Sequence, residues 1–285
     1  MKIKFSLIFC RIIGDLPEPG HVVVGLDLAT WVNHMTDERD VQINAYWESY
    51  TTTSMNDAYV ATLETEMLAR YIRSEDRILD LGCGDGSGSL GYRKICPNYT
   101  GLDRSLKMLK VFSEREPGLP LARCDLRFLP ISPRQALPFS VVITQRSLIN
   151  LPDAESQEIV LSQLPAYLRP GGQLLLCEAF REGAENINAL RTQFGFKAIP
   201  ARWHNVHLER ALTERVLSGK MELLAEEDLS MYFFLTRVVK QIINGEVALG
   251  WDDPFNKMAF ELARSPHSPR FKGYSHISLQ VWVKR

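Results

Sequence analysis

The chain has 285 residues, of which 45% are hydrophobic and 24% charged, and its formal net charge is −1. This length and composition allow one large domain, or a domain with a small added lobe, to bury a continuous core. Acidic and basic residues are interspersed, so no basic stripe predicts a nucleic-acid partner and no acidic tail predicts a solvating arm. Charge therefore disfavours a function in nucleic-acid binding.

The cysteines and the N-terminus both favour a cytoplasmic protein. The five cysteines lie singly, without a Cys-x-x-Cys pair or a Cys/His cluster of metal-ligand spacing, as is typical of reduced thiols. A signal peptide is disfavoured because Arg11 interrupts the first apolar run and no small-residue cleavage site follows it. No uncharged apolar run is long enough to span a bilayer. We therefore expect a cytoplasmic protein that binds no metal.

The first 45 residues differ from the rest of the chain. We interpret 1–45 as an N-terminal extension or arm, in which IKFSLIF and HVVVGLDL are candidate strands, and 46–285 as one domain. A helix is predicted after Ser54, because apolar residues from Met55 to Tyr71 recur at spacings of three and four. Residues 243–271 are predicted to be a C-terminal insertion that either borders the active site or decorates the surface.

From residue 77 onward, short apolar runs alternate with helical patterns. Helices are predicted around 106–115 and 153–168, and Pro170-Gly171-Gly172 marks the step into the next strand. The last run, HISLQVWVKR, predicts a strand with one less buried face that lies antiparallel at the sheet edge. The alternation predicts an α/β, doubly wound, mostly parallel sheet with helices on both faces. The other predicted strands are RILDLGC, YTGLDRS, PLARCDL, FSVVITQ and GQLLLCEAF.

The turn after the first of these strands is rich in glycine. RILDLGCGDGSGSL, residues 77–90, places four glycines within seven positions. In a doubly wound sheet, this turn lies at the carboxyl ends of the strands, where a ligand binds. A Cβ at Gly82, Gly84 or Gly86 would push the ligand away from the peptide planes, and some of these positions are expected to need positive φ. We interpret the turn as a binding loop, since a plain connection needs only one or two glycines.

An aspartate at the end of the next strand indicates the kind of ligand. Asp103 follows the loop by about twenty residues, where a carboxylate can accept hydrogen bonds from both hydroxyls of a ribose. An adenosine-like group is therefore expected, from a nicotinamide dinucleotide or from S-adenosylmethionine. The dinucleotide loop reads G-x-G-x-x-G, whereas this loop reads G-x-G-x-G-x-G and begins behind Asp80.

Several segments resemble one family. DLGCGDG resembles the D-x-G-x-G-x-G first motif of the class I S-adenosylmethionine-dependent methyltransferases, and GLDRS resembles their second motif. Segments that resemble the later motifs follow in the family's order between about residues 54 and 180, and the ending SHISLQVWVKR resembles the terminal strand. The later segments are CDLRFLP, VVITQRSLINLP and LRPGGQLLLCE. The resemblance implies a Rossmann-like, seven-stranded sheet with an antiparallel last strand, and S-adenosylmethionine as the cofactor.

The same resemblance implies roles for single residues. The turn glycines would cradle the methionine part of the cofactor, and Asp80 would lie beneath its amino group, although Asp80 could instead cap the turn. Asp103 would hold the ribose, Asp125 with Leu126 would frame the adenine, and Gln145 would face the transferable methyl group. The residues predicted to bind the cofactor are Asp80, Gly82, Cys83, Gly84, Gly86, Asp103, Arg104, Asp125, Leu126 and Gln145.

The acceptor side offers three candidate catalytic residues, Gln145, Arg146 and His204. Methyl transfer from a sulfonium is an in-line displacement that needs alignment and exclusion of water, and a hydroxyl acceptor is helped by a general base. Arg146 either grips a carboxylate or phosphate or forms a surface ion pair. His204 is either a general base, oriented by Asn205 or Glu178, or a half-buried packing residue. His207 would share a helical face with it if this segment is helical.

Two further patterns bear on the acceptor. The aromatic residues Tyr46, Trp47, Tyr50 and Tyr59 either form a lid over the cofactor or staple the N-terminal lobe to the core. The pattern E…N-x-L-R…G-f…i-p…W-H-N, residues 178–205, resembles a methyltransferase subgroup associated with bacterial glycan and surface-polysaccharide modification.

We therefore expect methyl transfer to oxygen or nitrogen of a small-molecule or sugar-like acceptor. A nucleic-acid methyltransferase is an alternative, disfavoured because TQRS stands where a Pro-Pro-aromatic triplet is expected and because no Pro-Cys nucleophile is present. A non-catalytic S-adenosylmethionine-binding scaffold is the other alternative.

Overall fold

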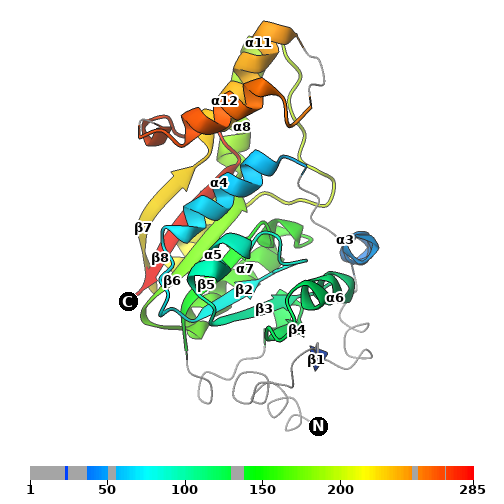
Figure 1. Ribbon diagram of the computed structural model, residues 1–285, viewed down its shortest axis with the longest axis vertical. Coiled ribbons are helices and arrows are strands. Elements are labelled where there is room, and N and C mark those ends of the chain that lie inside the picture. Colours follow the sequence, from blue (N-terminus) through cyan, green and yellow to red (C-terminus); the bar gives the residue numbers. More distant parts are fainter. Residues whose placement is uncertain (1–22, 25–36, 51–55, 130–137, 246–249, 267) are drawn as a thin grey trace.

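The structure is a computed structural model that describes residues 23–24, 37–50, 56–129, 138–245, 250–266 and 268–285 (Figure 1). The predicted strand IKFSLIF and the predicted helix start at Ser54 lie outside the described residues. Within these ranges, one sheet has the strand order β1-β4-β3-β2-β5-β6-β8-β7. Apart from the two-residue β1 (Val23–Val24), this is a seven-stranded sheet that is parallel except for β8, which confirms the predicted fold class.

The parallel centre of the sheet brings the predicted binding turns together. β2 lies between β3 and β5 and pairs in parallel with both. The turns after Leu81, Asp103 and Gln145 therefore lie together at the carboxyl ends of these strands. All four residues of β2 are buried, as expected for a strand covered on both faces. The parallel strands beyond β1 and before the C-terminal pair are β2 (Ile78–Leu81), β3 (Tyr99–Asp103), β4 (Leu121–Arg123), β5 (Phe139–Gln145) and β6 (Leu168–Ala179).

The helices largely follow the predicted pattern. α6 is found at the predicted 106–115, and the predicted 153–168 becomes α7 followed by the 3-10 turn Leu164–Tyr167. The predicted domain boundary at residue 45 falls inside α3, and the division into extension and domain stays a prediction. The helices of the main domain are α3 (Glu38–Ser49), α4 (Ala58–Ala69), α5 (Leu90–Ile95), α6 (Leu106–Arg115), α7 (Ala154–Gln163), α8 (Arg181–Gln193) and α9 (Arg210–Leu217).

The sheet edge differs from the prediction. β8 (Ile277–Lys284) is not an edge strand but lies between β6 and β7, and its first six residues are buried, so both faces of this part of the strand are covered. The edge is β7 (Met221–Asp228), which was not predicted because its sequence, MELLAEED, does not alternate between apolar and polar residues. Pro170-Gly171-Gly172 does not separate a helix from a strand; it lies within β6, at a shift in its register with β5.

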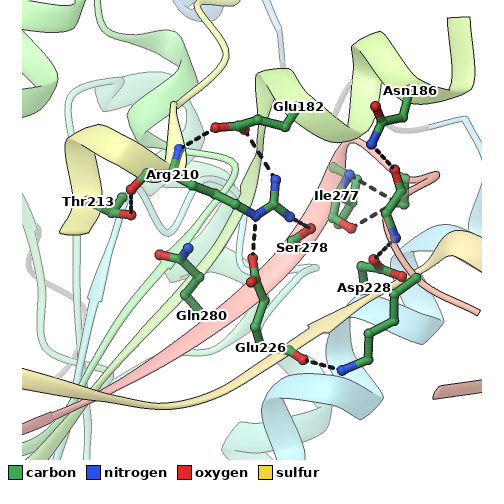
Figure 2. A network of polar contacts seen from close by, with 12 residues as sticks. Glu182, Asn186, Arg210, Thr213, Glu226, Asp228, Ile277, Ser278 and Gln280 are labelled. Atoms are coloured by element: carbon green, nitrogen blue, oxygen red, sulfur yellow. Dashed lines mark hydrogen bonds and ion pairs between the residues drawn. The ribbon is translucent and has the colours of Figure 1, made fainter. Parts of the chain in front are cut away.

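A polar network around Arg210 joins this edge to the helices beside it (Figure 2). The Arg210 guanidinium donates to Glu226 of β7 (2.8 Å), Glu182 of α8 (3.2 Å) and Ser278 of β8 (3.3 Å). Asp228 of β7 accepts the backbone N–H of Gly273, just before β8, at 2.8 Å. These partly exposed groups contribute little stability individually, but together they fix β7 against α8, α9 and β8.

A group of short helices lies beyond the C-terminal end of β7, and we call this group the C-terminal cap (Figure 1). It consists of α10 (Ser230–Phe234), a π-helical turn (Leu235–Val239), α11 (Lys240–Asn244) and α12 (Pro254–Ala263). α12 packs against α4 and α10, so the cap is continuous with the core. It contains much of the predicted insertion at 243–271, whose status as an insertion stays a prediction. In the described part of the chain, no helix has both the length and the apolarity to cross a membrane.

Candidate functional site

The glycine loop follows β2. Its first three glycines are required for different reasons. Gly82, Gly84 and Gly86 all have positive φ, between 54° and 80°, which confirms that the turn requires glycine. A Cβ added to Gly82 would lie 2.2 Å from Ser147, and one on Gly86 would lie 2.3 Å from the Phe112 ring. A Cβ on Gly84 would meet nothing within 4 Å. Only Gly84 therefore leaves open space beside the backbone that a ligand can fill.

A first cavity of about 140 Å³ lies over this loop. Nearly all of the residues predicted to bind the cofactor line it; Gly86 does not, because it faces Phe112 instead. The predicted residues that line it are Asp80, Gly82, Cys83, Gly84, Asp103, Arg104, Asp125, Leu126 and Gln145. Further lining residues, for which no role was predicted, are Asp85, Ser87, Gly88, Ser89, Tyr92, Met108 and Leu151. Four of these lie in the loop itself, so the glycine-rich sequence of the loop was the available signal.

Asp80, the acid at the end of β2, is buried against two tyrosines. Its Oδ2 accepts hydrogen bonds from the hydroxyls of Tyr92 (2.8 Å) and Tyr99 (2.6 Å). Burial raises the pKa of Asp80 to about 6, and the two hydrogen bonds oppose that rise. Asp80 is thus mainly ionised at neutral pH, and a carboxylate at this place in the cavity suits an ammonium group. Because Asp80 accepts hydrogen bonds from two tyrosine hydroxyls, its contacts do not favour the alternative that it simply caps the turn.

Asp103 joins the loop to the end of β3. Its carboxylate accepts the backbone N–H of Gly84 and that of Ser105, both at 2.8 Å. Burial raises its pKa, while these two N–H donors favour the ionised form. The side chain therefore fixes the one glycine that has open space beside it, and it lines the cavity into which a ribose is predicted to fit.

At the predicted adenine end of the cavity, α3 is held by ion pairs. Asp40 of α3 accepts from Arg104 (2.8 Å) and Arg127 (2.6 Å), and Arg127 also binds Asp125 (2.6 Å). Although burial opposes it, the hydrogen bond from Arg127 and the charges of Arg104 and Arg127 lower the pKa of Asp125. Both oxygens of Asp125 accept from Arg127, so its predicted adenine contact would add to an existing bidentate pair.

Gln145 and Arg146, at the end of β5, share a buried partner. The Oε2 atom of Glu64 accepts from Gln145 Nε2 (2.9 Å) and from Arg146 Nε (3.1 Å), and the Glu64 side chain is fully buried. Arg146 is therefore not in a surface ion pair. It also has φ of 53°, the one positive φ found among the described non-glycine residues. A strained backbone of this kind is common at functional sites.

The loop after Arg146 is anchored by Glu178 of β6. The carboxylate of Glu178 accepts the backbone N–H groups of Ser147 and Leu148, both at 3.1 Å, and of Ile149 at 3.4 Å. Burial raises its pKa to about 7, whereas these donors favour its ionised form. Glu178 thus positions the 147–149 turn rather than His204, contrary to one of the predicted roles.

A second cavity of about 250 Å³ adjoins the first, and Trp47, Arg146 and Asn150 line both. Trp47 of α3 donates from Nε1 to Asn150 Oδ1 at 3.3 Å, so Trp47 lies where the cavities meet; whether the aromatic residues form a lid or a staple stays a prediction. Tyr59 lies apart from this cluster, against Phe260 of α12, with ring centroids 5.0 Å apart.

His204 lines the second cavity and not the first. Its ring stacks on Tyr46 with centroids 4.4 Å apart, and only 2% of the residue is exposed. Burial and the charges of Arg202 and Arg39 lower its pKa to about 4, so the imidazole is neutral at pH 7. Its Nδ1 atom has no hydrogen-bond partner among the described residues. His204 is therefore packed as a buried ring, as one predicted role requires. One of its ring nitrogens nevertheless has no hydrogen-bond partner among the described residues.

His207 does not share a helical face with His204, because the segment between Ala201 and Glu209 is not helical. Instead, its ring stacks on that of His276 at 5.8 Å, and both line the second cavity. No group of three or more potential metal-ligating residues occurs in the portion of the chain that the structure describes. The four described cysteines, Cys83, Cys96, Cys124 and Cys177, are buried free thiols, in line with the reduced thiols expected from their spacing.

The fold and the first cavity together define a protein of the Rossmann-like class that binds a nucleoside cofactor at the carboxyl ends of its strands. Comparison with known proteins narrows the class. Residues 78–172 match the model of a family described as "Methyltransferase domain". This region of the chain is thus similar to the class I S-adenosylmethionine-dependent methyltransferases, and S-adenosylmethionine is the cofactor that the residues around Gly84 and Asp103 fit.

Two relatives and one structure show the range of the similarity. A demethylmenaquinone methyltransferase of Streptomyces griseus is 30% identical over 128 residues, which cover 45% of this chain and 53% of that protein. A malonyl-[acyl-carrier protein] O-methyltransferase of Enterobacter lignolyticus is 28% identical over 178 residues, covering 62% and 64%. The structure of a geranyl diphosphate C-methyltransferase from Streptomyces coelicolor aligns with a TM-score of 0.55 and 12% identity, covering 88% of this chain and 100% of that one. The chain spans about half the length of the curated demethylmenaquinone methyltransferases it matches.

Proposed function

We propose that the chain transfers the methyl group of S-adenosylmethionine to an oxygen or nitrogen atom of a small-molecule or sugar-like acceptor. One observation carries this proposal: the cavity that contains the predicted cofactor residues opens beside a second cavity, and Trp47, Arg146 and Asn150 belong to both. Two ligands bound in adjoining cavities can be aligned for direct transfer, and alignment supplies much of the catalysis in such displacements.

The residues of the chain have separate roles in this proposal. S-adenosylmethionine, when bound, supplies an electrophilic methyl group on a positively charged sulfur. Asp80 and Asp103 bind its polar groups, and Gly84 lets it approach the backbone. Glu64 positions Gln145 in the first cavity and Arg146 where the cavities meet. His204, neutral at pH 7, accepts a proton from a hydroxyl or amine acceptor.

The relatives support a small acceptor but not one particular atom. One relative's name describes an O-methyltransferase and another a demethylmenaquinone methyltransferase, and these acceptors belong to those proteins. The C-methyltransferase from Streptomyces coelicolor shares only the fold. The preference for oxygen or nitrogen therefore rests on the neutral His204 in the second cavity, and the sugar-like acceptor on the sequence pattern that ends at Asn205.

Cofactor binding is the first test. Calorimetry should give a dissociation constant for S-adenosylmethionine of about 1–100 µM for the wild type. Asp103→Ala should weaken binding at least about tenfold, because it removes a charged hydrogen-bond acceptor. Glu155→Ala, at an exposed position of α7, is the matched control and should bind as the wild type does. Heat with a nicotinamide dinucleotide instead of S-adenosylmethionine would contradict the cofactor assignment.

Release of S-adenosylhomocysteine tests the acceptor. Sugar nucleotides, small hydroxy acids and single- and double-stranded oligonucleotides should be offered separately to the wild type with S-adenosylmethionine. Product with a small molecule supports the proposal, whereas product only with an oligonucleotide favours a nucleic-acid methyltransferase. Tight cofactor binding without product from a broad acceptor set favours the non-catalytic scaffold.

A further inference from the structure

Arg237 lies in the C-terminal cap, on an uncommon turn of helix that borders the second cavity. It is the central residue of the π-helical turn Leu235–Val239 between α10 and α11. π-helical turns are rare and occur frequently at functional sites. Arg237 belongs to no motif identified in the sequence, and it lines the second cavity without lining the first.

The neighbours of Arg237 hold its guanidinium in place. Nη2 donates to Asp57 Oδ2 at 3.1 Å, and Nη1 donates to Thr236 Oγ1 at 2.9 Å. The rings of Trp251 and Phe233 lie 4.8 Å and 5.0 Å from the guanidinium carbon. A guanidinium has five N–H donors, and these two hydrogen bonds use two of them. The group is thus fixed and retains donors for a ligand.

The charges around the second cavity are predominantly positive. Arg146, Arg202 and Arg237 line it, against the single lining carboxylate of Asp57, while Glu64 lies behind Arg146. His276 is one of the histidines that line the cavity. Its pKa is lowered to about 3, mainly by burial and further by the charges of its neighbours. All three arginines contribute to that decrease, so their charges act on the same part of the cavity.

The rest of the cavity suits a small amphipathic molecule. Apolar side chains such as Val60, Ile149 and Ile187 line it beside the aromatic rings. Two buried polar atoms in its lining, His204 Nδ1 and Asn205 Oδ1, have no hydrogen-bond partner in the ranges that the structure describes. Buried polar atoms are rarely left unpaired in folded proteins, so these atoms indicate a ligand with hydrogen-bonding groups.

We propose that the methyl acceptor carries an oxyanion, a carboxylate or a phosphate, and that Arg237 binds it in the part of the second cavity that the first does not share. This inference rests on the proposed function, since it assigns the substrate class of the same site. Bidentate binding by a fixed guanidinium orients the acceptor as well as holding it. Arg237 is therefore a specificity-determining residue that selects anionic acceptors.

The test uses the full chain saturated with S-adenosylhomocysteine and three small probes. Benzoate carries a carboxylate, phenyl phosphate a phosphate, and benzyl alcohol is their neutral analogue. Their binding should be measured by calorimetry or ligand-observed NMR for the wild type, Arg237→Gln, Arg237→Lys and Arg264→Gln. Arg264 is the matched control because it directly follows α12 of the same cap, pairs with Glu66 at 3.1 Å and lines neither cavity.

We expect the wild type to bind at least one oxyanion about 10- to 100-fold more tightly than benzyl alcohol. Arg237→Gln should abolish this preference, Arg237→Lys should retain part of it, and Arg264→Gln should retain all of it. The affinity for S-adenosylhomocysteine should not change. Equal binding of charged and neutral probes, a preference that survives Arg237→Gln, or dissociation constants weaker than about 10 mM for both oxyanions would overturn the proposal.

Two further measurements keep the result interpretable. If Arg237→Gln does not fold, the wild type alone provides the test: inorganic phosphate should displace the oxyanion probe that binds more tightly but not benzyl alcohol. Displacement of both probes, or of neither, would count against the proposal. A wild type that does not bind S-adenosylhomocysteine would contradict the proposed function itself, which separates that failure from a failure of the anion assignment.

Discussion

The two cavities of this protein are built in opposite ways. The first is formed mainly by consecutive residues of one glycine loop and by the ends of neighbouring parallel strands. The second is assembled from α3, α4, α8, the 199–207 segment, the C-terminal cap and the start of β8. The cofactor side thus depends on local backbone geometry, whereas the acceptor side depends on contacts between distant segments. This difference explains how one cofactor site can be combined with many acceptors.

The largest expected effect separates packing from ligand approach within the glycine loop. Gly86→Ala should lower the free energy of unfolding by about 2–5 kcal/mol, because its Cβ would overlap Phe112 and φ is positive. Gly84→Ala should cost only about 1–2 kcal/mol, the price of positive φ alone, yet should weaken S-adenosylmethionine binding. Denaturant unfolding and calorimetry of both variants measure the two effects. Equal losses of stability would refute the different roles assigned to the two glycines.

The next effect concerns the second cavity. His204→Phe should keep the ring contact with Tyr46 but reduce turnover about 100-fold, as loss of a general base does. Affinity for S-adenosylmethionine should not change, because His204 does not line the first cavity. His207→Phe, a substitution in the same cavity, is the control. Similar turnover losses in both variants would indicate a packing role for His204.

The pH dependence of wild-type turnover should show whether His204, with its lowered pKa, is the base. Because the pKa of His204 is lowered to about 4, turnover should fall on acidification near pH 4 rather than near 6.5. The pKa of His204 is lower in the folded protein than in the unfolded chain. The free energy of unfolding should therefore fall as the pH falls from about 6.5 towards 4. A turnover limb near pH 6.5 would show that another group acts as the base.

Cofactor binding should have its own pH dependence through Asp80. Its pKa is raised to about 6, so S-adenosylmethionine affinity should fall up to about tenfold per pH unit below 6 as the carboxylate becomes protonated. Stability should change in the opposite sense: between about pH 4 and 6, this group makes the unfolding free energy fall as pH rises. Asp80→Asn should abolish both trends in calorimetry and in denaturant unfolding. Persistence of the affinity trend in Asp80→Asn would assign it to another group.

The smallest expected effect lies outside both cavities, where α3 docks on α6. Glu48 accepts the backbone N–H of Leu106 at 2.9 Å and pairs with Arg123 at 3.3 Å. Glu48→Gln should lower the unfolding free energy by about 0.5–1 kcal/mol, as loss of a charged helix cap does. Glu38→Gln, at an exposed position in the first turn of α3, removes a helix N-terminal charge without a docking contact and should have the smaller effect. No difference between these variants would mean that α3 docks without help from this cap.

The sequence by itself determined the cofactor side of this protein. Alternating apolar runs and helical patterns led to the parallel sheet, and the glycine spacing with Asp80 and Asp103 led to the loop and to most of the first cavity's lining. These features are readable because burial on both faces of a strand and positive φ in a turn each restrict the residue types at fixed spacings.

The tertiary structure alone decided the acceptor side. Glu64 meets Arg146 across 82 positions, and Asp57 meets Arg237 across 180 positions. The placement of β8 inside the sheet likewise follows from its pairing with β7, an edge strand without a clear pattern. No local periodicity encodes such contacts, because they form only when the whole core packs and brings distant side chains to one cavity.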